Sequence, residues 1–156
     1  MEKRERLLNA DEAAKRFRPI LAAGGQVTLA VTGRSMLPYL RQGRDRVCLT
    51  ALTRPPRRGD IIFFRRLTGG WVLHRVLRRT ADGCVVCGDA QLEAETVKRE
   101  QIAAVVTTVE RGDCRIAATD LRFRAWGAIR LASRPMRRLL AGVRHATGRR
   151  SHEQKE

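Results

Sequence analysis

The sequence contains no run of about 18 or more apolar residues, which excludes a hydrophobic helix that spans a bilayer. The N-terminal segment at 1–6 mixes charges of both signs and leads into no apolar core of the signal-peptide type. We therefore expect the chain to stay in the cytoplasm. Cysteine occurs only at Cys48, Cys84, Cys87 and Cys114, and in that compartment we expect reduced thiols and not a disulfide framework.

Lysine is also scarce, at positions 3, 15, 98 and 155 only, so nearly all of the basic charge is arginine. The chain carries 32 basic and 16 acidic side chains, a formal net charge of +16. This balance favours an anionic partner such as a phospholipid surface, nucleic acid or an acidic peptide. A GC-rich genome explains the scattered arginines equally well, but explains the clustered ones less well. A length of 156 residues suits one domain with its own core.

The N-terminal residues 1–25 read as a helix. Asn9 followed by Glu12 has the spacing of a capping box, and apolar residues recur after it. Pro19 is expected to kink or divide this helix, and the glycine pair at 24–25 to end it.

From residue 26 to about 118 the pattern changes to short runs rich in β-branched and aromatic residues, separated by glycine, proline and aspartate. The expected strands are 27–31, 47–52, 61–64, 71–77, 84–87 and 102–109. Two hairpins are expected, one across Gly69 and Gly70 and the other across Asp82 and Gly83. The sequence therefore predicts a mainly β fold, a small antiparallel β domain at 26–118.

The segment from Val31 to Leu40 places a hydroxyl on a constrained turn directly after the first expected strand. Gly33 permits backbone angles closed to other residues, and Pro38 fixes its own φ angle. Ser35 lies between them, where a nucleophile can be exposed beside backbone N–H groups. On spacing alone, an ordinary surface turn containing serine explains the segment as well.

His74 lies in the expected strand 71–77, on the face that it shares with Val72 and Val76. A histidine on an apolar face is commonly a hydrogen-bonded core residue. A base for Ser35 would instead need a third group to orient the imidazole. Asp89 and Glu95 follow the neighbouring strand and are the candidates, although acids in turns are usually solvated caps.

Four successive motifs resemble the signal peptidase I and LexA-type serine peptidase superfamily. They are Gly33-Arg34-Ser35-Met36-Leu37-Pro38, Arg58-Gly59-Asp60-Ile61-Ile62-Phe63, Leu73-His74-Arg75-Val76 and Gly88-Asp89. The resemblance covers about 27–109 in order and spacing. It implies a peptidase that cleaves through an acyl-enzyme on Ser35, with neither cofactor nor metal.

Bacterial signal peptidases and LexA use a lysine base, but this chain has no lysine between Lys15 and Lys98. His74 occupies the place of the base, as in the Ser–His–acid branch of endoplasmic-reticulum signal peptidases. The resemblance implies Asp89 or Glu95 as the orienting acid, with Asp89 ranked first. Some relatives also carry a hydroxyl two positions before the nucleophile.

At that hydroxyl position this chain has Gly33, so the oxyanion hole would rest on backbone N–H groups, that of Ser35 first. Arg34, Met36 and Pro38 complete this turn. The substrate would be a peptide or a precursor protein. Two alternatives stay open: a LexA-like peptidase that cleaves itself or one dedicated precursor, and a non-catalytic peptide-binding module of the same fold.

Three other patterns suggest no separate function. Cys84 and Cys87 have the spacing of a zinc knuckle, but no second knuckle follows and strand alternation separates the two thiols. The Arg-Gly-Asp triplet at 58–60 is expected to be a turn that leads into a strand. Asp45 is interpreted as turn chemistry.

The tail at 119–156 carries ten basic and three acidic side chains, and reads as helical. Ser133 is expected to cap a helix that Gly148 ends. Within that helix Met136, Leu139, Leu140 and Val143 fall on one stripe, with Arg137, Arg138, Arg144 and His145 on another side. The tail as a whole extends this apolar stripe with Trp126 and Ile129. The stripe either packs on the β domain or lies on an anionic membrane surface, which would make the protein peripheral on the inner face of the membrane. Nucleic acid is not favoured as a partner because no groove-reading module is visible.

Overall fold

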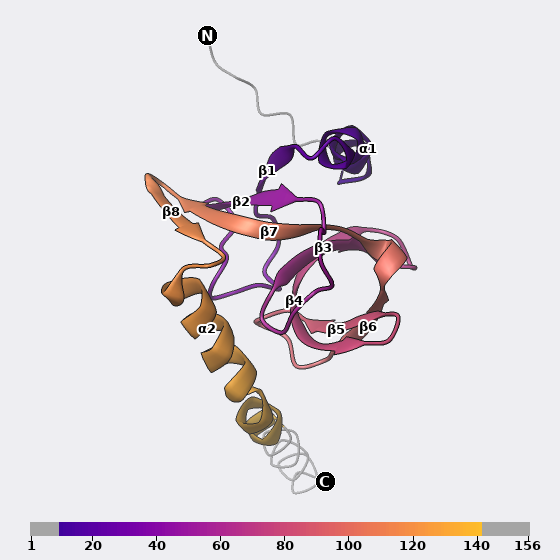
Figure 1. Ribbon diagram of the computed structural model, residues 1–156. Coiled ribbons are helices and arrows are strands. Elements are labelled where there is room, and N and C mark those ends of the chain that lie inside the picture. Colours follow the sequence, from indigo (N-terminus) through magenta and orange to yellow (C-terminus); the bar gives the residue numbers. More distant parts are fainter. Residues whose placement is uncertain (1–9, 142–156) are drawn as a thin grey trace, which may run out of the picture.

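The computed structural model describes residues 10–141 and confirms a mainly β fold (Figure 1). The strands form one antiparallel sheet. One helix precedes this sheet in the sequence and another follows it. The elements are α1 (Ala10–Ala22), β1 (Gln26–Ala30), β2 (Asp45–Thr50), β3 (Ile61–Arg65), β4 (Trp71–Thr80), β5 (Gly83–Cys87), β6 (Glu95–Lys98), a 3-10 turn (Arg99–Gln101), β7 (Ile102–Arg111), β8 (Cys114–Ala117) and α2 (Leu121–Ala132).

The strands lie in the order β1–β2–β7–β3–β4–β5–β6, and β8 pairs with β7 outside this path. Figure 1 shows that β3 to β6 curl round, whereas β1, β2 and β8 extend from the long β7. The long strand β7 therefore connects the curled part of the sheet to the rest, because it pairs with β3 on one side and with β2 on the other.

Both expected hairpins are confirmed: β3 pairs with β4, and β4 with β5. The sequence did not indicate β6 and β8. Each of these strands has only four residues, and each buries one side chain, Val97 in β6 and Ile116 in β8. So short a segment shows no apolar alternation, which explains why both were missed.

The N-terminal helix α1 is a single helix that runs through Pro19, so the expected division at this proline is wrong. It ends at Gly24, where φ is +78°, as expected. Asn9 of the expected capping box lies outside the described part of the chain, and Glu12 lies within α1.

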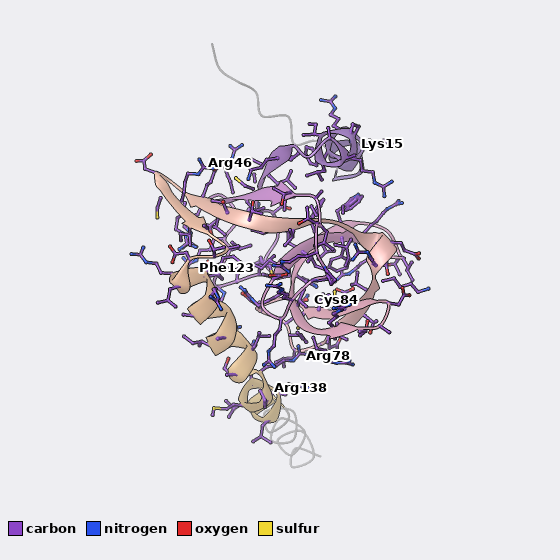
Figure 2. All side chains as sticks on the ribbon, viewed as in Figure 1. Lys15, Arg46, Arg78, Cys84, Phe123 and Arg138 are labelled. Atoms are coloured by element: carbon purple, nitrogen blue, oxygen red, sulfur yellow. The ribbon has the colours of Figure 1, made fainter. Side chains whose placement is uncertain are left out.

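Two apolar clusters fill the two faces of the sheet. The larger one joins β1, β2 and β7 to the 31–40 segment and to Phe123 of α2. The smaller one lies inside the curl and is built from Ile62, Phe64, Val76 and Val86 with their neighbours. Figure 2 shows Phe123 between α2 and the sheet, and Cys84 within the curl.

The helix α2 begins at Asp120, whose carboxylate accepts a hydrogen bond from the Arg122 N–H at 2.8 Å. Ser133 is the C-cap of α2, and its hydroxyl donates to the carbonyl of Arg130. Ser133 does directly precede the next helical segment, whose Arg137 N–H donates to the Ser133 carbonyl, but the Ser133 hydroxyl does not cap that segment. A further helical segment begins at 134 and is described to 141, so Val143, Arg144, His145 and Gly148 lie outside the described residues.

The tail packs on the β domain through Phe123 and Trp126, but most of the expected apolar stripe does not. Ile129, Met136 and Leu139 are 60, 67 and 70% exposed, and Leu140 is 57% exposed. The interpretation that the stripe is core is wrong for these four residues. Within residues 10–141, no helix has both the length and the hydrophobicity needed to cross a membrane.

Candidate functional site

Ser35 lies on a tight turn that buried neighbours fix in place. Gly33 has a φ of +77°, which favours glycine, and its N–H donates to Gln42 Oε1 at 3.0 Å. Met36 and Leu40 are buried, and the Leu40 N–H donates to the Met36 carbonyl. The Leu37–Pro38 peptide bond is cis. The turn is thus anchored on both sides of the partly exposed Ser35.

The loop after β5 packs directly against the backbone of Ser35. The Ala90 N–H donates to the Ser35 carbonyl at 2.8 Å. A Cβ atom at Gly88 would lie 2.6 Å from that same carbonyl oxygen, which is too close for any side chain. Glycine at 88 is therefore required for this approach, and the contact ties the serine turn to the loop at 88–95.

His74 lies in the middle of β4 and is 1% exposed. It pairs with Ile62 of β3, and its ring contacts that of Phe64 edge-on at a centroid distance of 5.8 Å. Its Nδ1 atom lies 2.9 Å from Glu95 Oε1, the distance of a hydrogen bond without the usual alignment. Its Nε2 atom is buried and has no hydrogen-bond partner among residues 10–141.

The end of the β4–β5 ladder brings His74 near the serine turn. The last paired residues are Arg75 and Cys87, so His74 and Gly88 are the next residues on either strand. Gly88 in turn contacts the Ser35 carbonyl. Because Nε2 has no partner in the described chain, the Ser35 hydroxyl is not hydrogen-bonded to His74 in this structure.

Glu95, at the start of β6, is held by two contacts. The guanidinium of Arg66 donates to both of its carboxylate oxygens, at 2.9 and 2.7 Å. This hydrogen bonding from Arg66 lowers the pKa of Glu95, and the nearby His74 lowers it further. Glu95 is therefore ionised at neutral pH, and its Oε1 atom lies within hydrogen-bond distance of Nδ1 of the imidazole.

Burial is the main cause that lowers the pKa of His74 below its ordinary value of 6.5. The charge of Glu95 raises the pKa, and the charge of Arg66 lowers it. The net direction is downward, so the imidazole is neutral at pH 7. A neutral histidine with a free Nε2 lone pair is the form that a general base requires.

Asp89, which the sequence ranked first as the partner of His74, binds Arg75 instead. Arg75 donates to both carboxylate oxygens at 2.8 Å, and both side chains are buried. Trp126 of α2 also lies 3.4 Å from Asp89 Oδ2. The ranking is corrected: Glu95 faces His74, and Asp89 belongs to a structural ion pair on the opposite face of β4.

Arg75 and Arg66 are the site residues that sequence reasoning missed. Arg75 also donates to the Gly59 carbonyl and lies over the rings of Tyr39 and Phe123. An arginine in the middle of an apolar strand was a usable signal for a buried partner. Arg66 gave no signal, because its pairing depends on the unrecognised strand β6.

The remaining motifs are structural. Asp60 binds Arg54 and the Arg57 N–H, which confirms a turn before β3. Cys84 lies in the core of the curl, and the Cys87 thiol donates to backbone carbonyls, most closely that of Glu93 at 2.9 Å.

Asp45 closes a turn, as expected: its carboxylate accepts from the Arg41 N–H, and its own N–H donates to the Arg41 carbonyl. The residue is 2% exposed and also accepts from the side chains of Arg44 and Arg111, which are partly exposed. A buried carboxylate thus joins two arginines at the start of β2.

A comparison of the chain with protein-family models, with curated proteins and with solved structures gives no match.

Proposed function

We propose that this chain is a serine endopeptidase of the signal-peptidase-like type. Ser35 is the nucleophile, His74 the general base and Glu95 the acid that orients the imidazole. The observation that carries the proposal is the contact of Nδ1 with Glu95, which leaves Nε2 without a partner among the described residues. The Ser35 carbonyl packs against Gly88, the residue after the β5 end of the ladder that pairs with the strand of His74. An acid that orients a neutral imidazole is one part of what a serine nucleophile needs.

The chemistry follows from these roles. Ser35 Oγ attacks the carbonyl carbon of the scissile peptide bond, and its proton passes to Nε2 of His74. The protonated imidazole then gives this proton to the leaving amine as the C–N bond breaks. Water next attacks the acyl-enzyme ester and loses a proton to His74. The bond between the acyl carbon and Ser35 Oγ then breaks, His74 returns the proton to Oγ, and the acid product leaves. The Ser35 N–H is the first candidate to bind the oxyanion.

A hollow of about 510 Å³ adjoins Glu95 and is lined by Arg66 and residues 90–95. The same loop contacts Ser35 through Ala90. A peptide or precursor protein that binds there would approach both the acid and the nucleophile. No step of this mechanism uses a cofactor.

The non-catalytic alternative is supported by one observation, the missing hydrogen bond between Ser35 and His74. Catalytic hydrogen bonds are often long or misaligned until substrate binds, so this alone does not decide. A peptide-binding module would keep the hollow but would not react. The LexA-like alternative would act on its own chain or on one dedicated precursor.

A fluorophosphonate probe, which reacts only with activated serines, tests the proposal. We expect stoichiometric labelling of the wild type, none of Ser35→Ala and unchanged labelling of the matched control Ser133→Ala. Absence of wild-type labelling, or equal labelling of Ser35→Ala, would make the peptidase assignment wrong. Mass spectrometry of the incubated protein separates the LexA-like alternative, because self-cleavage produces fragments that Ser35→Ala lacks.

We also propose that the tail brings the protein to an anionic membrane surface, as a peripheral protein on the inner face of the membrane. The exposed Ile129, Met136 and Leu139 provide an apolar face, and Arg122, Arg124 and Arg138 are exposed beside it. Apolar and basic side chains together suit the headgroup layer of an anionic bilayer.

A further inference from the structure

Three arginines of the C-terminal helices point at the loop at 88–95. Arg130, Arg134 and Arg137, here called the arginine cluster, recur at helical spacing on one face. Arg130 and Arg137 donate to the Asp89 carbonyl, and Arg134 to the Leu92 carbonyl. All three cations are thus bound to neutral acceptors.

The carboxylate beside this cluster is already paired with another arginine. A small cavity of about 10 Å³ lies between the cluster, Arg75, Asp89 and Cys87. Asp89 is the one acid that lines it, and both of its carboxylate oxygens are bound by Arg75. The three charges of the cluster therefore have no counter-charge among the residues that line the cavity. Burial, and next the charge of Arg130, lower the pKa of Arg137, as expected for crowded cations.

Donors of the cluster are also left without acceptors. Arg130 Nε, Arg134 Nη1 and Arg137 Nε are buried and have no hydrogen-bond partner within residues 10–141. A guanidinium can only donate hydrogen bonds, so each of these N–H groups needs an acceptor, and another donor or cation cannot satisfy it. Each buried donor left unpaired costs free energy. The site needs a ligand that only accepts hydrogen bonds and carries negative charge.

We propose that this cavity is a binding site for a small monatomic anion of the chloride class. Its volume of about 10 Å³ is near the smallest that holds one water-sized particle, which favours a single-atom anion over a tetrahedral oxoanion. A water molecule would fit, but it accepts at most two hydrogen bonds and leaves the charge uncompensated. The anion would join the C-terminal helices to the loop that carries Glu95 and supports Ser35. This proposal does not rest on the peptidase assignment.

The test compares thermal unfolding of the full chain in sodium chloride and in sodium gluconate at equal ionic strength. Gluconate is too large for the cavity and serves as the screening control. A ligand that binds only the folded state raises the melting temperature, and we expect a rise of about 3–6 °C in saturating chloride. Equal melting temperatures in the two salts would overturn the proposal, because water then fills the site.

The matched variants are Arg137→Gln and Arg138→Gln, which remove the same charge from neighbouring positions. Arg138 is exposed, and Figure 2 labels it on the helical segment that follows α2. We expect the chloride-dependent shift to be lost in Arg137→Gln and kept in Arg138→Gln. Loss or retention in both variants would contradict the site. Since each protein is compared with itself in two salts, general destabilisation does not confuse the result.

Bromide-soaked crystals of the wild type provide a second measurement if Arg137→Gln does not fold. We expect an anomalous peak in the cavity between the arginine cluster and Asp89. A structure without such a peak would overturn the proposal. Stabilisation by phosphate but not by chloride or bromide would also overturn it, because it would show an oxoanion site.

Discussion

Glu95 lies 2.9 Å from His74 Nδ1, whereas Asp89 is bound on both carboxylate oxygens by Arg75. His74 and Arg75 are successive residues of β4, and their side chains lie on opposite faces of the sheet. Two acids that the sequence could not distinguish therefore have separate environments. One faces the candidate base and is 31% exposed, and the other is buried in an ion pair.

This separation predicts opposite effects for two isosteric substitutions. Asp89→Asn breaks a buried ion pair, so we expect a loss of about 3–5 kcal/mol in the free energy of unfolding. Glu95→Gln should change stability much less, but lower kcat/KM by a factor on the order of 10²–10⁴ because the imidazole loses its orienting charge. Urea unfolding and peptidase kinetics measure the two quantities. Equal stability losses, with activity lost only in Asp89→Asn, would restore the original ranking.

The sheet could be predicted from sequence because its longer strands alternate apolar residues and are separated by turn residues. The position of Glu95 could not, because it depends on β6. Glu95 pairs with Val86 of β5, and Val86 pairs with Val76 of β4, two residues from His74. Without β6 there was no register from which to place Glu95. Asp89 follows soon after β5, the strand that pairs with β4, and this closeness in sequence favoured Asp89 over Glu95.

The tail shows a similar limit. Helical periodicity identified the apolar stripe, but periodicity alone does not say which face of a helix meets the protein. The body-facing contacts beyond Trp126 come from arginines, with long side chains that reach the carbonyls of Asp89 and Leu92. Such pairing to backbone groups has no pattern in the sequence, so the orientation of the helix could not be predicted.

The pKa of His74 predicts how activity and stability depend on pH. The general base must be neutral, and burial lowers its pKa, so we expect the acid limb of kcat/KM below pH 6.5. Because the pKa of His74 is lower in the folded state than in the unfolded state, the unfolded state binds more protons between these two pKa values. The free energy of unfolding should therefore fall as the pH drops through 6.5 and level off below the folded pKa. The stability that ionised Glu95 contributes is lost at lower pH, below the ordinary glutamate pKa of 4.5, because the pKa of Glu95 is lowered in the folded state.

Denaturant unfolding of wild type and His74→Phe across pH 4–8 separates these contributions. The variant lacks the titrating imidazole, so its stability should be flatter between the folded pKa of His74 and pH 6.5. An acid limb well above pH 6.5, or identical stability profiles, would show that this histidine is not the group concerned.

Arg66 is a positioning residue, and its removal should move the pH profile. Arg66→Met deletes the bidentate contact to Glu95 and the positive charge that lowers the pKa of His74. We expect the acid limb to shift to higher pH and kcat to fall, with a stability loss of no more than about 1 kcal/mol for a partly exposed pair. The exposed Arg78→Met is the matched control and should leave the limb in place. A purely structural Arg66 would lower stability without moving the limb.

Membrane binding is best tested without deleting the tail, because Phe123 is 4% exposed and belongs to the core, so a truncation at 119 would remove it and uncover the core residues against which it packs. The substitutions Ile129→Ser, Met136→Ser and Leu139→Ser, made together, change only exposed positions. Leu67→Ser is the control, since Leu67 is 85% exposed and belongs to the turn between β3 and β4, not to the tail.

We expect the wild type and Leu67→Ser to sediment with vesicles that contain phosphatidylserine, and the triple variant to stay in solution. Attraction of arginine to such a surface decays over a Debye length of about 8 Å at physiological salt. Wild-type binding should therefore weaken as salt is raised, and should be absent with phosphatidylcholine alone. Equal sedimentation with both kinds of vesicle would indicate non-specific adsorption. If the wild type does not sediment with anionic vesicles at low salt, the exposed apolar face does not serve membrane binding.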